Sequence, residues 1–369
     1  MKQGWEIKKL GEIATFQRGL TYSKNDEVEY SNNCVLRSNN IELETMSLIL
    51  DELKFLREDF VVGEDKKIKK DTILICMSNG SKQHIGKVAF IKKDYDYAFG
   101  GFMGLIKPKS NIFPKFLFYS CLSSSYKQFL AEVGNGANIT NIKFSDLSQF
   151  AIPIPPLPEQ EKIVEELDCL SGIIEKKKQQ LKEYDALAHS IFYEMFGNPI
   201  DNEKGWEMKK VIDVVKLQRG YDLPTKERVQ DGDIPVWGSN GIVGYHNVAK
   251  INFGIVTGRS GTLGIVYSFD KPFFPLNTTL FSIDTHGNNI VYLRFLLNRF
   301  DLKRFGTGTG VPTLNRNTFH NEKIINVPLA LQQEFASKIE AIEKQKELIK
   351  QSIAETETLF NSRMDYYFS

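Results

Sequence analysis

Apolar residues recur at alternating steps of four and three through the middle of the chain. This seam follows four prolines within residues 152–158 and stops before Gly197 and Pro199. Pro158 suits a first helical turn, whereas Gly197 and Pro199 end a helix. The pattern predicts a helix over residues 158–196, about 57 Å long at 1.5 Å per residue. Its seam consists of Ile163, Leu167, Leu170, Ile174, Lys177, Leu181, Tyr184, Ala188, Ile191 and Met195.

A second seam with the same spacing fills residues 330–369. Residues 327–334, which precede it, are a weaker form of the proline-rich segment that precedes the first seam. Even the lysine within the seam recurs. Each seam by itself is typical of an amphipathic helix packed on its own domain. Two of similar length in one chain favour a coiled coil in which the helices pair with each other. The second seam consists of Phe335, Ile339, Ile342, Lys346, Ile349, Ile353, Thr356 and Phe360.

The segments between the predicted helices repeat at a constant offset of 201 residues. The motifs Gly-Trp-Glu, Lys-Lys and Gln-Arg-Gly stand at 4–6, 8–9 and 17–19 and again at 205–207, 209–210 and 218–220. This register predicts a tandem duplication of a globular unit followed by a helix. The predicted boundaries are 1–157 and 199–329 for the globular units, and 158–198 and 330–369 for the helical segments.

Each globular unit combines strand and helix patterns, which predicts a mixed α+β fold. Two β-branched runs flank a polar glycine loop in each unit, which is typical of a strand, a loop and a second strand. These runs are 72–77 with 86–91 and 254–257 with 264–267. A helix is predicted near 116–130 and near 290–300. Because the scaffold repeats while the polar loops differ, we expect two binding units with different targets.

Charge is distributed unevenly although the whole chain carries only +1. Residues 1–150 carry +3 and residues 199–329 carry +4, whereas 158–196 carry −4 and 330–369 carry −2. A phosphate-binding surface is therefore expected on the globular units. The start of the chain has no apolar run and no stretch of 18 apolar residues exists, which predicts no signal peptide and no membrane span. The four scattered cysteines are typical of reduced thiols, so we expect a cytoplasmic protein.

Motifs for catalysis or metal binding are incomplete. The segment Gly80 to Lys87 has the wrong spacing for a phosphate loop, and Val88 replaces the hydroxyl residue that holds magnesium. The glycine run 305–310 follows a predicted helix rather than a strand, unlike the S-adenosylmethionine loop of methyltransferases. The five histidines have no metal-ligand spacing, and we expect no metal site. These patterns favour a binding protein over an enzyme.

The chain resembles the specificity (S) subunit of type I restriction–modification enzymes in four features taken together. These are the proline-Glu-Gln-Glu start of the first helix, the seam that ends at Phe196-Gly197-Asn198-Pro199, the repeated motifs at the start of each globular unit, and the duplication. The resemblance covers the whole chain, although residues 329–331 lack the proline cluster that precedes the first seam. It implies two target recognition domains that each read one half of a split double-stranded DNA site. It also implies two helical regions that pair antiparallel, giving a pseudo-two-fold molecule.

The resemblance further implies partners that perform the chemistry. Two modification subunits would dock on the helices and methylate adenine with S-adenosylmethionine. Restriction subunits, an endonuclease and translocase, would add ATP- and Mg²⁺-dependent translocation and cleavage. This chain itself would hold no cofactor and catalyse nothing.

Base-reading residues are expected in the polar loops, because Asn and Gln suit adenine while Arg and Lys suit guanine. The candidates in the first unit are Arg18, Asn79, Lys82, Gln83, Asn138 and Asn141. Those in the second unit are Arg219, Tyr221, Ser239, Asn240, Tyr245, Arg259, Thr309 and Arg316. Each is alternatively a loop residue that contacts phosphate or caps a turn.

Three other functions remain open at this point. One is the specificity component of a related fused or type II-like system with a split site. Another is a stand-alone DNA methyltransferase or nuclease, which would bind S-adenosylmethionine or cut DNA without partners. The third is a coiled-coil scaffold with no nucleic-acid role, whose binding to DNA would show neither salt dependence nor sequence preference.

Overall fold

The chain forms two compact units in the computed structural model, which describes residues 4–133, 141–308 and 310–369. The first unit comprises Met1–Lys176 and Ser352–Ser369, and the second comprises Lys177–Gln351. Each unit therefore contains part of both long helices, α5 (Leu157–Phe196) and α9 (Leu329–Phe368). None of the helices in the described part of the chain combines the length and apolar character that a membrane crossing needs.

The first unit is built around an antiparallel sheet in the order β2-β9-β6-β7. Its strands are β2 (Ala14–Arg18), β9 (Met103–Pro108), β6 (Ile73–Cys76) and β7 (Val88–Phe90). A second sheet has the order β3-β5-β4-β8, in which β4 and β8 are parallel. Its strands are β3 (Glu27–Val28), β5 (Lys54–Leu56), β4 (Asn33–Leu36) and β8 (Tyr97–Phe99). The strands β1 (Glu6–Lys9) and β10 (Ala151–Ile154) pair separately.

The second unit repeats this plan, which confirms the duplication. Its main sheet has the order β12-β18-β15-β16, with β12 (Lys216–Arg219), β18 (Thr279–Asp284), β15 (Gly254–Gly258) and β16 (Val266–Phe269). A three-stranded sheet follows the order β14-β13-β17, again with one parallel pair, and contains β14 (Gly241–His246), β13 (Ile234–Gly238) and β17 (Phe274–Pro275). The remaining pairs are β11 (Glu207–Lys210) with β21 (Lys323–Asn326) and β19 (Gly306–Thr307) with β20 (Thr313–Leu314).

Short helices connect these strands. They are α1 (Leu10–Ile13), α2 (Pro114–Ser120), α3 (Ser124–Val133), α4 (Phe144–Leu147), α6 (Val211–Val214), α7 (Ile290–Arg299) and α8 (Arg316–His320). Single 3₁₀ turns are η1 (Lys24–Asp26), η2 (Ser38–Asn40), η3 (Glu64–Lys66), η4 (Lys82–His84), η5 (Thr225–Glu227) and η6 (Leu302–Phe305). The single helix predicted near 116–130 is wrong, because α2 and α3 are separate. Ser120 and Ser123 bond to backbone carbonyls three residues earlier, and Ser123 Oγ also accepts from Tyr126 N, so these hydroxyls compete with helix continuation.

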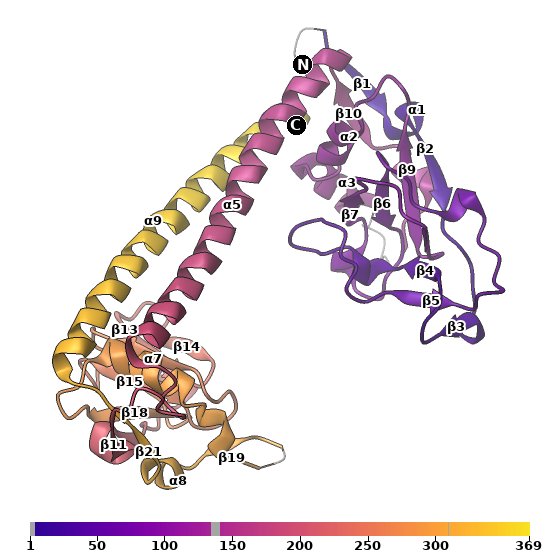
Figure 1. Cartoon of the computed structure of the whole chain (residues 1–369). Coiled ribbons are helices and arrows are strands. Elements are labelled where there is room, and N and C mark those ends of the chain that lie inside the picture. Colours follow the sequence, from indigo (N-terminus) through magenta and orange to yellow (C-terminus); the bar gives the residue numbers. More distant parts are fainter. Residues whose placement is uncertain (1–3, 134–140, 309) are drawn as a thin grey trace. The chain divides into compact units, whose positions relative to one another are not determined.

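The long helices pair antiparallel, as Figure 1 shows for α5 and α9 side by side. In the first unit Arg363 Nη2 donates to Glu166 Oε2 at 2.9 Å. In the second unit Lys346 Nζ lies 2.7 Å from Asp185 Oδ1. Since residue numbers rise along α5 while they fall along α9, these two contacts fix an antiparallel register. The helix α5 ends as predicted, with Gly197 at a φ of +74°, the left-handed conformation that glycine adopts after a helix.

The hydrophobic core of each unit includes the start of one long helix and the end of the other. In the first unit Leu167 of α5 and Phe368 of α9 lie in the same buried cluster. In the second unit Phe335 of α9 packs 5.6 Å from Phe192 of α5, centroid to centroid. Seam residues at the helix ends therefore contact strands and short helices as well as the opposite helix.

The exposure of the seam residues changes along the helices. The buried seam residues are Ile163, Leu167, Phe335, Ile339, Ile342 and Ile353. The half-buried seam residues are Leu170, Ile174, Leu181, Tyr184, Ile191 and Ile349. Which of them contribute most to helix pairing stays a prediction, as do the boundaries of the four predicted segments.

Candidate nucleic-acid interface

The repeated Gln-Arg-Gly motif ends the first strand of the main sheet in both units. A Cβ atom added to Gly19 would lie 2.0 Å from the carbonyl oxygen of Gly100, and one added to Gly220 would lie 2.1 Å from that of Leu276. No side chain fits at such a distance. The repeated glycine is therefore required where the backbone passes close to another backbone segment. The arginine before this glycine, Arg18 or Arg219, is exposed at the strand end.

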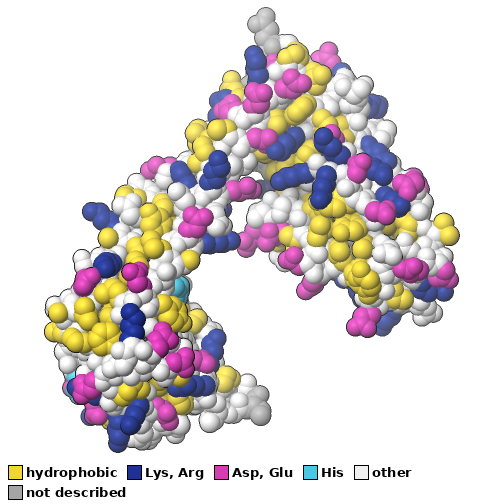
Figure 2. All heavy atoms as spheres, in the orientation of Figure 1, with side chains coloured by type: hydrophobic (Ala, Val, Ile, Leu, Met, Phe, Trp, Pro, Cys, Tyr) yellow, Lys and Arg dark blue, Asp and Glu magenta, His cyan; other side chains and the backbone are white. Residues whose placement is uncertain are grey.

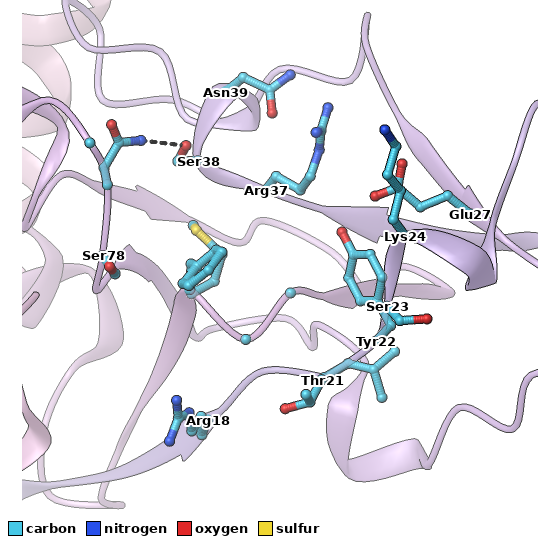
Figure 3. A pocket seen from close by; sticks show the side chains of 17 residues that line it. Arg18, Thr21, Tyr22, Ser23, Lys24, Glu27, Arg37, Ser38, Asn39 and Ser78 are labelled. Atoms are coloured by element: carbon cyan, nitrogen blue, oxygen red, sulfur yellow. Dashed lines mark hydrogen bonds between the residues drawn. The ribbon is translucent and has the colours of Figure 1, made fainter. Parts of the chain in front are cut away.

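A cleft of about 860 Å³ opens beside Arg18 in the first unit (Figure 3). Residues from the ends of β2, β4 and β6 and from the β8–β9 turn line it. Two predicted residues, Arg18 and Asn79, belong to it. Asn79 Nδ2 donates to Ser38 Oγ at 2.8 Å, which ties the loop after β6 to the turn after β4. Figure 3 shows Arg18 at one end of the cleft and Asn39 toward the other.

Several lining residues were not predicted from the sequence, and Arg37 is the most informative. Its Nε atom is buried without a hydrogen-bond partner, and within the described residues its guanidinium forms no ion pair. Burial raises the pKa of Tyr22, and the nearby Glu27 raises it further, whereas Arg37 opposes this shift. Phe102 also lines the cleft with 72% of its surface exposed. The cleft thus offers an uncompensated cation beside aromatic and amide groups.

The other predicted residues of the first unit lie elsewhere. Lys82 and Gln83 are exposed on η4, and Gln83 lines a different cleft, of about 910 Å³, beside α3 and α5. Asn141 forms an isolated β-bridge with Ser78, which places it at the edge of the cleft that contains Arg18. Asn138 lies outside the described residues.

Asn277 brings three predicted residues of the second unit together. Its backbone N–H donates to Tyr221 O at 2.8 Å, and its carbonyl accepts from Arg259 Nη1 at 3.4 Å. Its side-chain amide donates to Asp222, which also forms an ion pair with Arg219 at 3.0 Å. Asp222 and Asn277 were not predicted, because Asn277, which joins the cluster, is 55 residues from Asp222 in sequence. Arg219 is therefore neutralised locally, whereas Arg259 has no carboxylate partner within the described residues.

The remaining predicted residues of the second unit divide into two groups. Ser239 and Asn240 form the β13–β14 turn, and Arg316 begins α8, close after Leu314, whose N–H donates to Arg259 O at 2.7 Å. Tyr245 lies on β14, where its backbone pairs with Val229 away from this cluster. Thr309 lies outside the described residues.

Two residues considered above for phosphate or metal binding, Lys87 and His320, have structural roles. Lys87 is buried and its Nζ donates to Ile41 O at 2.6 Å, so it is not available to a phosphate group. His320 Nε2 accepts a hydrogen bond from Leu217 N at 3.1 Å. Burial, and to a smaller extent the nearby charge of Arg316, lowers the pKa of His320 to about 4, which keeps the imidazole neutral. Within the described ranges no group of three His, Cys, Asp or Glu residues is arranged for a metal ion.

Charge alone does not mark the interface. On the face shown in Figure 2, basic and acidic side chains are interspersed over both units. The candidate interface therefore consists of the strand-end loops, where polar side chains surround a cleft in the first unit and a hydrogen-bonded cluster in the second.

Comparison with known proteins matches both halves of the chain. The family model of the type I restriction modification DNA specificity domain covers residues 2–183 and 203–358. The specificity subunit of the type I restriction enzyme EcoKI from Escherichia coli (strain K12) is 31% identical over 206 residues, 55% of this chain and 44% of that protein. The StySPI specificity subunit from Salmonella potsdam is 32% identical over 186 residues, 50% of this chain and 40% of that protein. The matches thus span less than half the length of either relative.

Two solved structures share the fold over nearly the whole chain. The S subunit of a type I restriction–modification system from M. genitalium superposes with a TM-score of 0.61 at 15% identity, covering 99% of this chain and 96% of that one. A chain from a type I R-M system, solved to explain its complex assembly and conformational transition, gives 0.61 at 16% identity and covers 99% and 97%. At these identities the likeness concerns the fold alone.

Proposed function

The chain belongs to the type I restriction modification DNA specificity family, and from this membership we propose that it is the sequence-specific DNA-binding subunit of a type I restriction–modification complex. The observation that carries the proposal is the duplicated unit whose strand-end loops occupy equivalent positions but differ in side chains. Each unit reads one part of a bipartite site. Because the loops of the two units differ, the two parts have different sequences.

The pseudo-two-fold plan suits duplex DNA, since a two-fold protein places equivalent surfaces on paired half-sites. The strand-end loops present Arg, Asn and Ser side chains, which bond to base edges and phosphates. Support for this interface comes from Arg37 and Arg259, whose guanidinium groups have no carboxylate partner within the described residues. The candidate contacts named from the sequence remain part of this proposal.

The long helices have two roles in the proposal. They set the unread spacer between the half-sites, and they dock two modification subunits. Both helices are 40 residues long, about 60 Å at 1.5 Å per residue. They are continuous through both compact units, which supports a stiff connection. We assign residues 158–198 and 330–369 to this role, and residues 1–157 and 199–329 to target recognition.

The chemistry resides on partners. The modification subunits bind S-adenosylmethionine and methylate adenine, and the restriction subunits use ATP and Mg²⁺ for translocation and cleavage. The chain itself is non-catalytic, binds no cofactor and acts in the cytoplasm.

Adenine methylation tests this function directly. A host that expresses the chain with its modification subunits should carry methylated adenines at one bipartite motif, read by single-molecule methylome sequencing. Replacing residues 205–329 with the second unit of another specificity subunit should change one half of that motif only. A change in both halves contradicts the proposal, as does methyl transfer or DNA cleavage by this chain alone.

A further inference from the structure

The turns after β4 and β13 carry the same two residues at the offset of 201. These are Ser38-Asn39 and Ser239-Asn240. In both units the serine lies next to the neighbouring loop. Ser38 Oγ accepts from Asn79, and a Cβ added to Gly261 would lie 3.3 Å from Ser239 Oγ. Ser38 thus ties its turn to the neighbouring loop, and the asparagine beside each serine is exposed.

The two exposed asparagines have few competing contacts. Asn39 Nδ2 approaches Glu52 Oε2 at 3.5 Å, the outer limit of a hydrogen bond, and its carbonyl oxygen has no partner within the described residues. Asn240 is exposed at the tip of the two-residue turn between β13 and β14. Equivalent amides are therefore presented to solvent at the same point of each unit.

Hydrogen bonds define a second pair of equivalent positions, Met77 and Arg259. Met77 N donates to Phe102 O, as Arg259 N donates to Thr278 O. The next β-bridges also correspond, Ser78 with Asn141 and Ser260 with Thr313. Met77 is buried with 6% of its surface exposed, whereas Arg259 is half-buried at the cluster around Asn277.

At the position of Arg37 the arginine lies in the first unit and not in the second. It precedes Ser38 by one residue, and its counterpart at the offset of 201 is Gly238, which has no side chain. Arg37 and Arg259 both lack a carboxylate partner within the described residues, and they come from different strand ends. The first follows β4 and the second follows β15.

The two half-sites have the same sugar–phosphate backbone but different bases. We propose that the shared residues Asn39 and Asn240 bind the DNA backbone at each half-site, while Arg37 and Arg259 each read a guanine in one half. Backbone contacts position a protein on DNA, and arginine binds guanine O6 and N7 through two parallel hydrogen bonds. This assignment rests on the proposed function and divides its candidate residues between positioning and specificity.

The test uses the full-length chain with its modification subunits and a library of DNA duplexes randomised over both half-sites. Bound sequences and overall affinity are measured for Arg37→Ala, Arg259→Ala, Asn39→Ala and Asn240→Ala. Matched controls are Arg57→Ala and Asn32→Ala, exposed residues outside the cleft. Circular dichroism confirms that each variant is folded.

Each arginine variant should lose its preference for one guanine, by roughly 5- to 150-fold, in one half-site only. Each asparagine variant should bind roughly 2- to 10-fold more weakly with an unchanged sequence preference. The inference is overturned if an asparagine variant relaxes one base position, or if the arginine variants weaken binding uniformly. A wild-type complex without any bipartite preference would instead contradict the proposed function itself.

Discussion

Gln160 at the start of α5 and Gln332 at the start of α9 hold equivalent backbone groups in the two units. Each glutamine is 1% exposed. Its side-chain amide accepts from the N–H before a short helix and donates to the carbonyl two residues before its own long helix. The groups are Phe113 N–H and Pro155 C=O for Gln160, and Asn289 N–H and Val327 C=O for Gln332. A single buried amide thus joins each recognition unit to the helix that leaves it.

Removing one of these amides should destabilise its unit. In Gln332→Ala, buried groups at Asn289 and Val327 lose their partner, and each orphaned group costs about 1–3 kcal/mol. We expect a lower midpoint in urea denaturation followed by circular dichroism. Gln333→Ala is the matched control, because Gln333 is the exposed neighbour on the same helix. An equal loss of stability in both variants would contradict this role.

The sequence predicted the elements that depend on local patterns, and missed those that depend on distant strands. Gly197 and Pro199 define the end of α5 in any context, and the Gln-Arg-Gly repeat is visible because its register has no gap. Ser38-Asn39 and Ser239-Asn240 share the same register, but only the fold shows that both pairs follow equivalent strands. After this pair the first unit runs through residues 40–53 before β5, whereas the second returns at once in β14.

Long-range pairing also decides which candidate residues meet. Arg37 enters the cleft because β4 pairs in parallel with β8, more than 50 residues away in sequence. The cluster around Asn277 forms because the β17–β18 turn lies beside the ends of β12 and β15. No local pattern encodes these neighbours. Residue type alone therefore selected Lys82 and Tyr245, which the fold places away from the cleft and the cluster.

The pair Glu166–Arg363 should make helix pairing sensitive to acid. Hydrogen bonds from Arg363 hold the pKa of Glu166 below its ordinary value. Burial raises this pKa, but a hydrogen bond from Tyr367 lowers it further. A carboxyl with a lowered pKa in the folded state stabilises the fold above its unfolded pKa, and this contribution is lost as pH falls through the folded pKa. Both groups are about one-third exposed, so the contribution is about 1 kcal/mol or less.

Glu166→Gln tests this contribution against pH. At neutral pH the variant should unfold at a slightly lower urea concentration than the wild type. Below the folded pKa of Glu166 the two midpoints should converge, because the wild-type carboxyl is then also neutral. A constant difference between the two midpoints from pH 7 to pH 3 would argue that the effect comes from packing.

Charges placed in the middle of the seam should separate the long helices. Leu170 and Leu181 are half-buried, so Leu170→Asp with Leu181→Asp introduces two carboxylates where the helices pack. We expect loss of modification-subunit docking in a pull-down, with the sheets of both units still folded by circular dichroism. The control for folding is Leu348→Asp, whose leucine is 52% exposed. Docking that survives the double substitution would contradict the assigned role of the helices.

Inserting one heptad into both long helices should lengthen the unread spacer of the DNA site. Seven residues preserve the seam register and add about 10.5 Å of helix, roughly three base pairs at 3.4 Å each. Insertions after Lys178 in α5 and after Lys350 in α9 keep the buried helix ends intact, because both positions are exposed. Methylome sequencing should then show the same bases in each half with a longer gap.

A two-residue insertion at the same two positions is the matched control, because about 200° of added rotation turns the seam away from the partner helix and should abolish specific methylation. If the heptad variant methylates with the original spacing, the helices do not set the gap, whatever the two units read. If it changes the bases, the recognition units depend on the helices for their conformation. Only a longer gap between unchanged half-sites agrees with helices that act as a spacer between independent recognition units.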